Sequence, residues 1–114
     1  MKAIKINTEV NLNTGLQLSS GSVVILYNGS AALNGMVNDI IPCTIITGVY
    51  VSELFYLEGK GQVDPGSILD FNTQNYYNLT LKAYQSETAE DLLTNAVLQY
   101  LDNIYPGNVE IIIL

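Results

Sequence analysis

The residues with the most obvious capacity for chemistry are three carboxylates close together in the chain, Glu87, Glu90 and Asp91. A pair of carboxylates can divide the roles of general acid and general base. Carboxylates in the first turn of a helix are, however, ordinary partners of the positive end of its dipole. The chain has no His, and its four basic residues are all Lys, so the usual proton carrier and the usual anion clamp are absent. We therefore expect no enzymatic activity and no small-molecule substrate.

Two further segments resemble ligand-binding loops only in part. Gly59-Lys60-Gly61 lacks both the glycine spacing of nucleotide-binding loops and a Ser or Thr after the lysine. The run from Asp70 to Asn75 begins like a calcium loop, but Asn75 replaces the required Gly, and Leu81 stands at the twelfth position. Cys43 is the sole cysteine and is expected to be a small buried hydrophobe. These patterns predict turns, with no metal and no cofactor.

The composition is poor in charge and rich in apolar residues. Charged residues make up 13% of the chain, hydrophobic residues 48%, and the net charge is −7. Nucleic-acid binding requires clustered basic residues, and the four lysines are dispersed. The first ten residues alternate like a strand and contain no apolar run that would suit a signal peptide or a membrane span. We expect neither a nucleic acid nor a membrane as partner.

The stretch from Ser86 to Gly107 is predicted to form the one long helix. Its apolar residues recur with helical spacing: Ala89, Leu92, Leu93, Ala96, Val97, Tyr100, Leu101 and Ile104. The opposite face, which includes Thr94, is expected to be polar. Ser86 or Thr88 can cap the start, and Pro106-Gly107 ends the helix. Because one helix cannot bury its own stripe, the remainder of the chain must supply the surface beneath it.

The rest of the sequence is typical of strands and turns. Strands are predicted over 3–6, 16–18, 22–27, 43–51, 67–71, 76–84 and 109–114. Asn28-Gly29 and Asn34-Gly35 predict two hairpin turns. Pro42 is placed to open a strand that Gly48 interrupts, where a bulge or a close backbone approach would fit. Ser52 to Gly59 fits a short helix or a strand, and we favour a strand. The expected fold is α+β in a single domain over residues 1–114: a mostly antiparallel sheet, or a small barrel or sandwich, with one long C-terminal amphipathic helix and a terminal strand.

Two kinds of residue are candidates for contact with partners. Eight tyrosines supply most of the aromatic surface, and Tyr is enriched in protein interfaces. The terminal strand is almost wholly apolar and carries Glu110 as its only charge, so it must pair or be covered. The candidate interaction residues are Tyr76, Tyr84, Ile111, Ile113 and Leu114. This composition fits extensive burial against neighbouring subunits. The alternative explanation is an ordinary β-rich domain with Asn in its turns and Tyr on its strands.

The segments GLQLSSGSVVIL, IPCTIITGVYV, DFN and YQSETAEDLLTNAVLQYLDNIYPGNVEII resemble small structural virion proteins. The group they resemble comes from tailed bacteriophages of gut Bacteroidetes, including the crAss-like phages. The resemblance runs from about Leu16 to Ile112 and carries no catalytic residues. It implies a non-enzymatic virion component that contacts copies of itself and other virion proteins, such as the major capsid protein or portal and neck proteins.

The resemblance implies a capsid auxiliary or decoration protein first, and a neck or head–tail joining ring protein as the alternative. We expect the chain to be made in the host cytoplasm without a signal peptide and to act in the virion. A different class also stays open: a small intracellular protein that binds one host protein through the acidic face of its helix.

Overall fold

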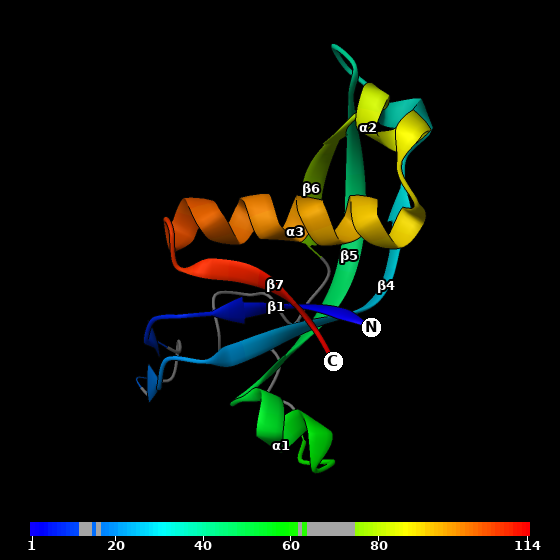
Figure 1. The fold of residues 1–114 in the computed structure, drawn as a ribbon. Helices are drawn as coiled ribbons and strands as arrows, with labels where there is room; N and C mark the ends of the chain where they lie inside the picture. Colours follow the sequence, from blue (N-terminus) through cyan, green and yellow to red (C-terminus); the bar gives the residue numbers. More distant parts are fainter. Residues whose placement is uncertain (12–14, 16, 62, 64–74) are drawn as a thin grey trace.

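The computed structural model describes residues 1–11, 15, 17–61, 63 and 75–114 (Figure 1). Five strands form one antiparallel sheet in the order β6-β5-β4-β1-β7. Their bounds are β1 Lys2–Ile6, β4 Ser22–Ala31, β5 Ile40–Tyr50, β6 Asn75–Thr80 and β7 Val109–Ile113. A separate pair joins β2 (Val10–Asn11) to β3 (Gln17–Leu18). The α+β fold is confirmed, and the sheet is open and not closed into a barrel.

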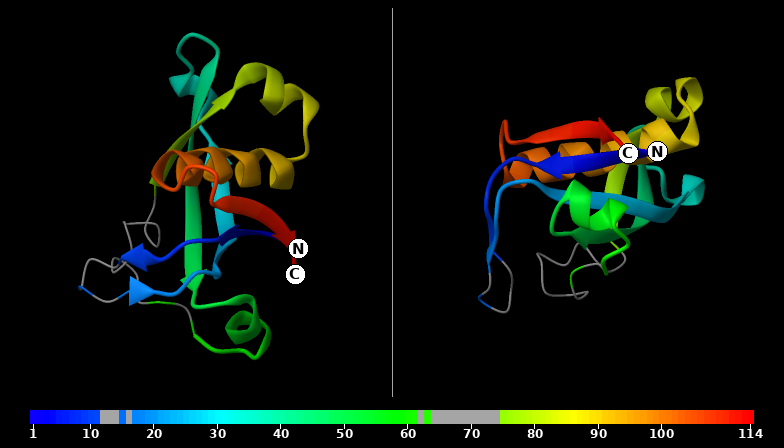
Figure 2. Two further views of the ribbon diagram at one scale, coloured as in Figure 1. Left: turned by 60° about the vertical axis from the view of Figure 1, so that its left-hand side comes forward. Right: turned by 60° about the horizontal axis from the view of Figure 1, so that its bottom comes forward.

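The long helix α3 (Ala89–Ile104) covers one face of the sheet (Figures 1 and 2). It begins where predicted, because the Thr88 side chain accepts a hydrogen bond from the backbone N–H of Asp91. Leu92, Ala96, Val97 and Leu101 are buried against residues of β1, β4 and β5. This packing confirms the predicted stripe over most of its length.

The structure differs from the predicted faces of α3 at Thr94, in the middle of the helix, and at Ile104, its last residue. Thr94, assigned to the polar face, is buried, and its hydroxyl donates to the Glu90 carbonyl one turn earlier at 2.7 Å. This hydrogen bond gives the Thr94 hydroxyl a partner at a position buried between α3 and the sheet. Ile104, assigned to the core, is 38% exposed. It occupies the last position of α3, where the helix extends beyond the core.

The other face of the sheet carries the short helix α1 (Glu53–Leu57), so the favoured strand in this segment was wrong. Ser52 caps α1 by accepting from the Phe55 backbone N–H at 3.2 Å. The cap and the Glu in the first turn decide the local structure. Beneath lies a second apolar cluster, built on Ala3, Val23 and Ile25. Residues 3–4 of β1 and 22–25 of β4 are thus buried on both faces of the sheet.

Strands β4 and β5 form one long hairpin, so the two predicted Asn-Gly turns were wrong. Asn28-Gly29 lies inside β4, just after a register shift between Leu26 and Asn28. The bulge is therefore in β4, whereas Gly48 pairs in register with Ile25. Asn34-Gly35 belongs to the 3-10 helix η1 (Leu33–Gly35).

The chain reverses at Asn38 and Asp39, which have φ of 52° and 63°. Positive φ at both central residues matches a two-residue hairpin turn, and an isolated bridge joins Val37 to Ile40 across it. Pro42 is the third residue of β5, near the end of the ladder with β4, and its carbonyl accepts from the Ala32 backbone N–H at 2.9 Å. β5 begins two residues earlier, at Ile40, and Pro42 pairs with Asn78 of β6, so the prediction that Pro42 opens the strand was wrong. Its missing N–H is tolerated because the ladder with β4 ends at the next residue, Cys43.

The segment predicted as one strand over 76–84 divides into two elements. β6 ends at Thr80, and α2 (Leu81–Ser86) follows at once. The Ser86 hydroxyl donates to the Lys82 carbonyl at 2.8 Å, so its side chain bonds within α2 and does not cap α3. The strand predicted over 67–71 and most of the turn predicted for the calcium-like run fall on residues 67–74, which lie outside the described part of the chain. Asn75, the last residue of that run, is the first residue of β6.

Candidate assembly surface

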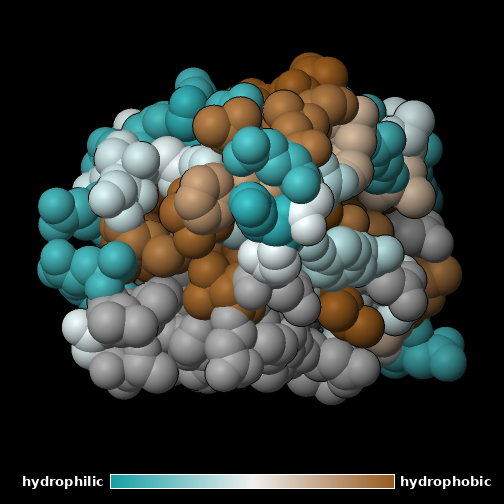
Figure 3. Space-filling model, turned by 90° about the horizontal axis from the view of Figure 1, so that it is seen from below, coloured by the Kyte–Doolittle hydropathy of each residue, from teal (hydrophilic) through white to brown (hydrophobic). Residues whose placement is uncertain are grey.

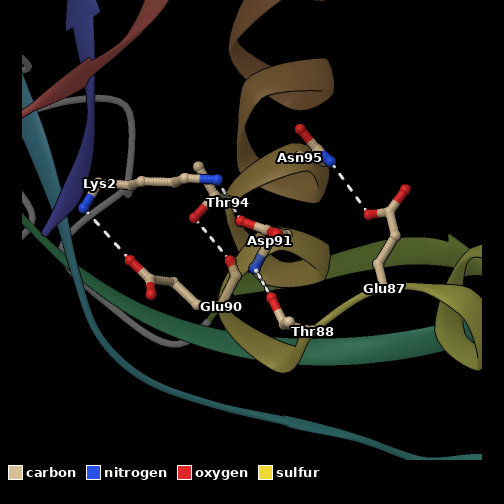
Figure 4. Close-up of polar contacts among 7 residues, drawn as sticks. All are labelled: Lys2, Glu87, Thr88, Glu90, Asp91, Thr94 and Asn95. Atoms are coloured by element: carbon tan, nitrogen blue, oxygen red, sulfur yellow. Dashed lines mark hydrogen bonds and ion pairs between the residues drawn. The ribbon is translucent and has the colours of Figure 1, made fainter.

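The carboxylates at the start of α3 tie elements of the chain together (Figure 4). Asp91 forms an ion pair with the Lys2 ammonium, and Glu90 Oε1 accepts from the Lys2 backbone N–H at 3.2 Å. Glu87 Oε2 accepts from the Asn95 amide at 3.2 Å. These contacts join β1 to α3 and fix the first turn of the helix. Glu90 and Asp91 lie in the first turn of α3 as predicted, whereas Glu87 lies before the capping residue Thr88.

The contact between Lys2 and Asp91 also shifts the pKa values of both groups. The hydrogen bond from Lys2, with a smaller one from Thr88, holds the pKa of Asp91 below its usual value. The hydrogen bond to Asp91 raises the pKa of Lys2 in turn. Each group therefore stays charged over a wider pH range than it would in an unfolded chain.

A hollow of about 330 Å³ opens beside Lys2 and Glu90. Strands β1 and β4 are paired from Ile4 and Val24 to Ile6 and Ser22. The strands separate on the other side of the Ile4–Val24 pair, toward Met1 and Tyr27. Leu26, Tyr27 and Leu93 supply apolar walls, while Lys2 and Glu90 lie at the same hollow.

Three tyrosines cover the face that bears α1. The hydroxyls of Tyr27 and Tyr50 are hydrogen-bonded to each other. The rings of Tyr50 and Tyr56 meet edge to face at 4.9 Å between centroids, and Tyr56 donates to the Met1 sulfur at 3.6 Å. Partial burial, followed by the bond to Tyr50, raises the pKa of Tyr27. This chain of contacts fastens α1 to the sheet and to the N-terminus.

Strand β7 lies at one edge of the described sheet, with β1 as its neighbour. Backbone bonds join Leu114 to Met1 and Asn108 to Asn7. Antiparallel pairing alternates, so even-numbered residues of β7 bond to β1, and the peptide groups of Val109, Ile111 and Ile113 point outward. We call these outward groups, with the Ile111 and Ile113 side chains, the β7 edge. The side chains of Ile111 and Ile113 are 37% and 71% exposed.

Groups of three or more exposed apolar side chains occur at two other places in the described part of the chain. On α1 they are Leu54, Phe55 and Leu57. Near the β4–β5 turn they are Leu33, Met36, Val37 and Ile40. Figure 3, which views the molecule from the side of α1, shows apolar residues interspersed with polar ones over this face. The β7 edge differs from both, because it combines apolar side chains with outward backbone donors and acceptors.

The predicted interaction residues do not form one surface. Ile111 and Ile113 share the β7 edge. Leu114 is half-buried and packs against the cluster under α1, so it supports the fold and does not belong to the exposed edge. Tyr76 lies on β6 at the opposite side of the sheet, and Tyr84 lies in α2; their side chains are outside the described part.

Sequence reasoning missed the apolar residues of α1 and of the β4–β5 turn. For α1 a signal was present, since Ser52 is followed by a Glu and an apolar run, as at the start of many helices. For the turn, the two Asn-Gly pairs are the stronger turn signals in the sequence, although the chain reverses at Asn38-Asp39. Nothing in periodicity alone marks Val37 or Ile40 as exposed.

Comparisons with protein-family models, with curated proteins and with solved structures find no match. Within the described residues, no three His, Cys, Asp or Glu side chains gather in a way that could hold a metal ion. In the same part of the chain, no helix is long and apolar enough to cross a membrane.

Proposed function

We propose that this chain is a non-enzymatic structural subunit of a tailed-phage virion. It assembles with copies of itself and with other virion proteins, and it acts first as an auxiliary or decoration protein of the capsid. The sequence resemblance is one support. The observation that carries the proposal is the β7 edge, where outward peptide groups stand beside Ile111 and Ile113.

The argument from the β7 edge is physical. Proteins that remain monomeric guard their edge strands with charges, prolines or covering loops, because unpaired peptide groups recruit other strands. Here Glu110 is the only charged residue of the strand, and it is paired in register with Lys5 of β1. An edge of this composition is best suited to being covered by another chain.

A neck or head–tail joining ring protein is the alternative within the virion. It would use the same kind of edge but would be present in far fewer copies. The host-binding alternative has less support, because it depends on the acidic face of α3. Asp91 and Glu90 on that face already contact Lys2 within the chain's own fold.

Mass spectrometry of purified particles of the encoding phage tests the proposal. We expect the chain at a fixed stoichiometry relative to the major capsid protein. Hundreds of copies per particle would support a decoration protein, and about a dozen would support a ring. Absence from purified particles, with the chain abundant in infected cells, would contradict the virion role and favour a host-binding protein.

A further inference from the structure

We propose that two copies of this chain pair through their β7 edges. The two strands run antiparallel about a two-fold axis at Ile111 and join two five-stranded sheets into one continuous sheet. The pairing rests on the proposed assembly function, and the partner is a second copy of the same chain.

The backbone of β7 determines the register. Its outward peptide groups belong to Val109, Ile111 and Ile113. With the axis at Ile111, each outward residue faces an outward residue of the second copy: Ile111 faces Ile111, and Val109 faces Ile113. Every such pair in an antiparallel ladder exchanges two hydrogen bonds. A shift of two residues in either direction leaves an end residue without its counterpart, so this register makes the most bonds within β7.

The side chains fit the same register. Ile111 and Ile113 are exposed in the single chain, and each would meet an apolar residue of the second copy on the same face. Glu110 would face Ile112 of the second copy and not the second Glu110. It also stays opposite Lys5 of its own β1. The strand is therefore self-complementary, with no like charges directly opposed, as a symmetric interface requires.

The size of the contact sets its strength. β7 has five residues, which makes a small interface compared with those of stable dimers. Association is expected to depend on concentration, and many copies gathered on one particle would favour it.

Cysteine crosslinking tests the register in the full chain. The natural Cys43 is buried, so the wild-type chain serves as the unreactive control. In the Ile111→Cys variant, the two introduced thiols lie on the axis, on residues about 5.5 Å apart at Cα. We expect a short bifunctional thiol reagent to convert this variant to a covalent dimer, while the wild-type chain stays single.

A mixed experiment provides the matched control. Val109→Cys alone and Ile113→Cys alone place like thiols about 14 Å apart along the strand, too far for the reagent. We expect neither to crosslink with itself. Mixed together, one variant of each should crosslink, because Val109 faces Ile113 in the proposed register. Thermal melts of all variants check that each remains folded.

The outcomes separate this inference from the function on which it rests. Crosslinking of Ile111→Cys, and of the mixture only, supports the two-fold pairing. Folded variants that fail to crosslink, at concentrations where the chain is incorporated into particles, overturn it while leaving the virion role in place. Crosslinking of Ile113→Cys with itself, and not of Ile111→Cys, would overturn the register.

Discussion

At the scale of single residues, Gly29 shows why the hairpin prediction at Asn28-Gly29 was wrong. A Cβ added at Gly29 would lie 2.8 Å from Leu93 Cδ1 and 3.4 Å from the Thr44 carbonyl oxygen. The glycine therefore serves close packing of β4 against α3, and not a turn. A dipeptide signal cannot distinguish these two uses, because both depend on the missing side chain.

This packing predicts a coupled pair. Gly29→Ala should destabilise the fold by about 1 kcal/mol, since the half-buried Leu93 side chain must move aside. In a Leu93→Ala background the added methyl has room, so the same substitution should cost little. Denaturant unfolding of both single variants and the double variant measures the coupling. Simple additivity would contradict the proposed contact.

The ion pair between Lys2 and Asp91 predicts a pH dependence. The pKa of Asp91 is lowered in the folded chain, so its contribution is present above the unfolded pKa and is lost as pH falls through the folded one. The pKa of Lys2 is raised, so its contribution is present at neutral pH and lost only in strong base. Asp91→Asn should therefore lower the melting temperature at neutral pH.

The effect of Asp91→Asn should shrink as pH falls below about 4, where the carboxylate first becomes neutral in the unfolded chain, and should vanish once the folded carboxylate is protonated as well. Melting curves across this range measure the difference. In a Lys2→Met background, Asp91→Asn should have a smaller effect at neutral pH, because the ion pair is already absent. An equal effect in both backgrounds would show that the pair does not stabilise the fold.

At the scale of elements, the sequence pattern predicted α3, β1 and β7. Helical spacing and the capping residue identified α3, alternation identified β1, and an apolar run identified β7. The errors fall where tertiary context decides. The segment after Thr80 continues as helix, and the segment after Ser52 is a helix instead of a strand. The composition of β7 indicated that this strand must pair or be covered, whereas its place at the sheet edge beside β1 became known only from the fold.

The stripe of α3 makes a graded prediction. Leu101 is fully buried, so Leu101→Ala should leave a cavity and cost about 2–5 kcal/mol. Ile104 is 38% exposed at the end of the same helix, so Ile104→Ala should cost clearly less. Denaturant unfolding of the two variants compares them directly. Equal losses would mean that the last turn of α3 is covered in solution.

At the scale of the whole molecule, the two chain ends lie side by side, with Leu114 N–H bonded to the Met1 carbonyl at 2.8 Å (Figure 1). Helix α3 covers one face of the sheet, and α1 covers part of the other (Figure 2). The β7 edge is left between them, beside the termini. The account's central claim is that this edge makes the contacts of assembly.

Incorporation of two matched variants into particles tests that claim most directly. Ile113→Lys places a charge on the β7 edge, at a side chain that is 71% exposed. Val37→Lys makes the same change in net charge near the β4–β5 turn, at a side chain that is 66% exposed. Both should fold with nearly wild-type melting temperatures, because neither side chain is in the core.

The measurement is the copy number of each variant in purified particles, relative to the wild-type chain. We expect Ile113→Lys to fall at least tenfold and Val37→Lys to stay near the wild-type level, because a lysine at the β7 edge opposes strand pairing. Wild-type incorporation of a folded Ile113→Lys chain would contradict the claim.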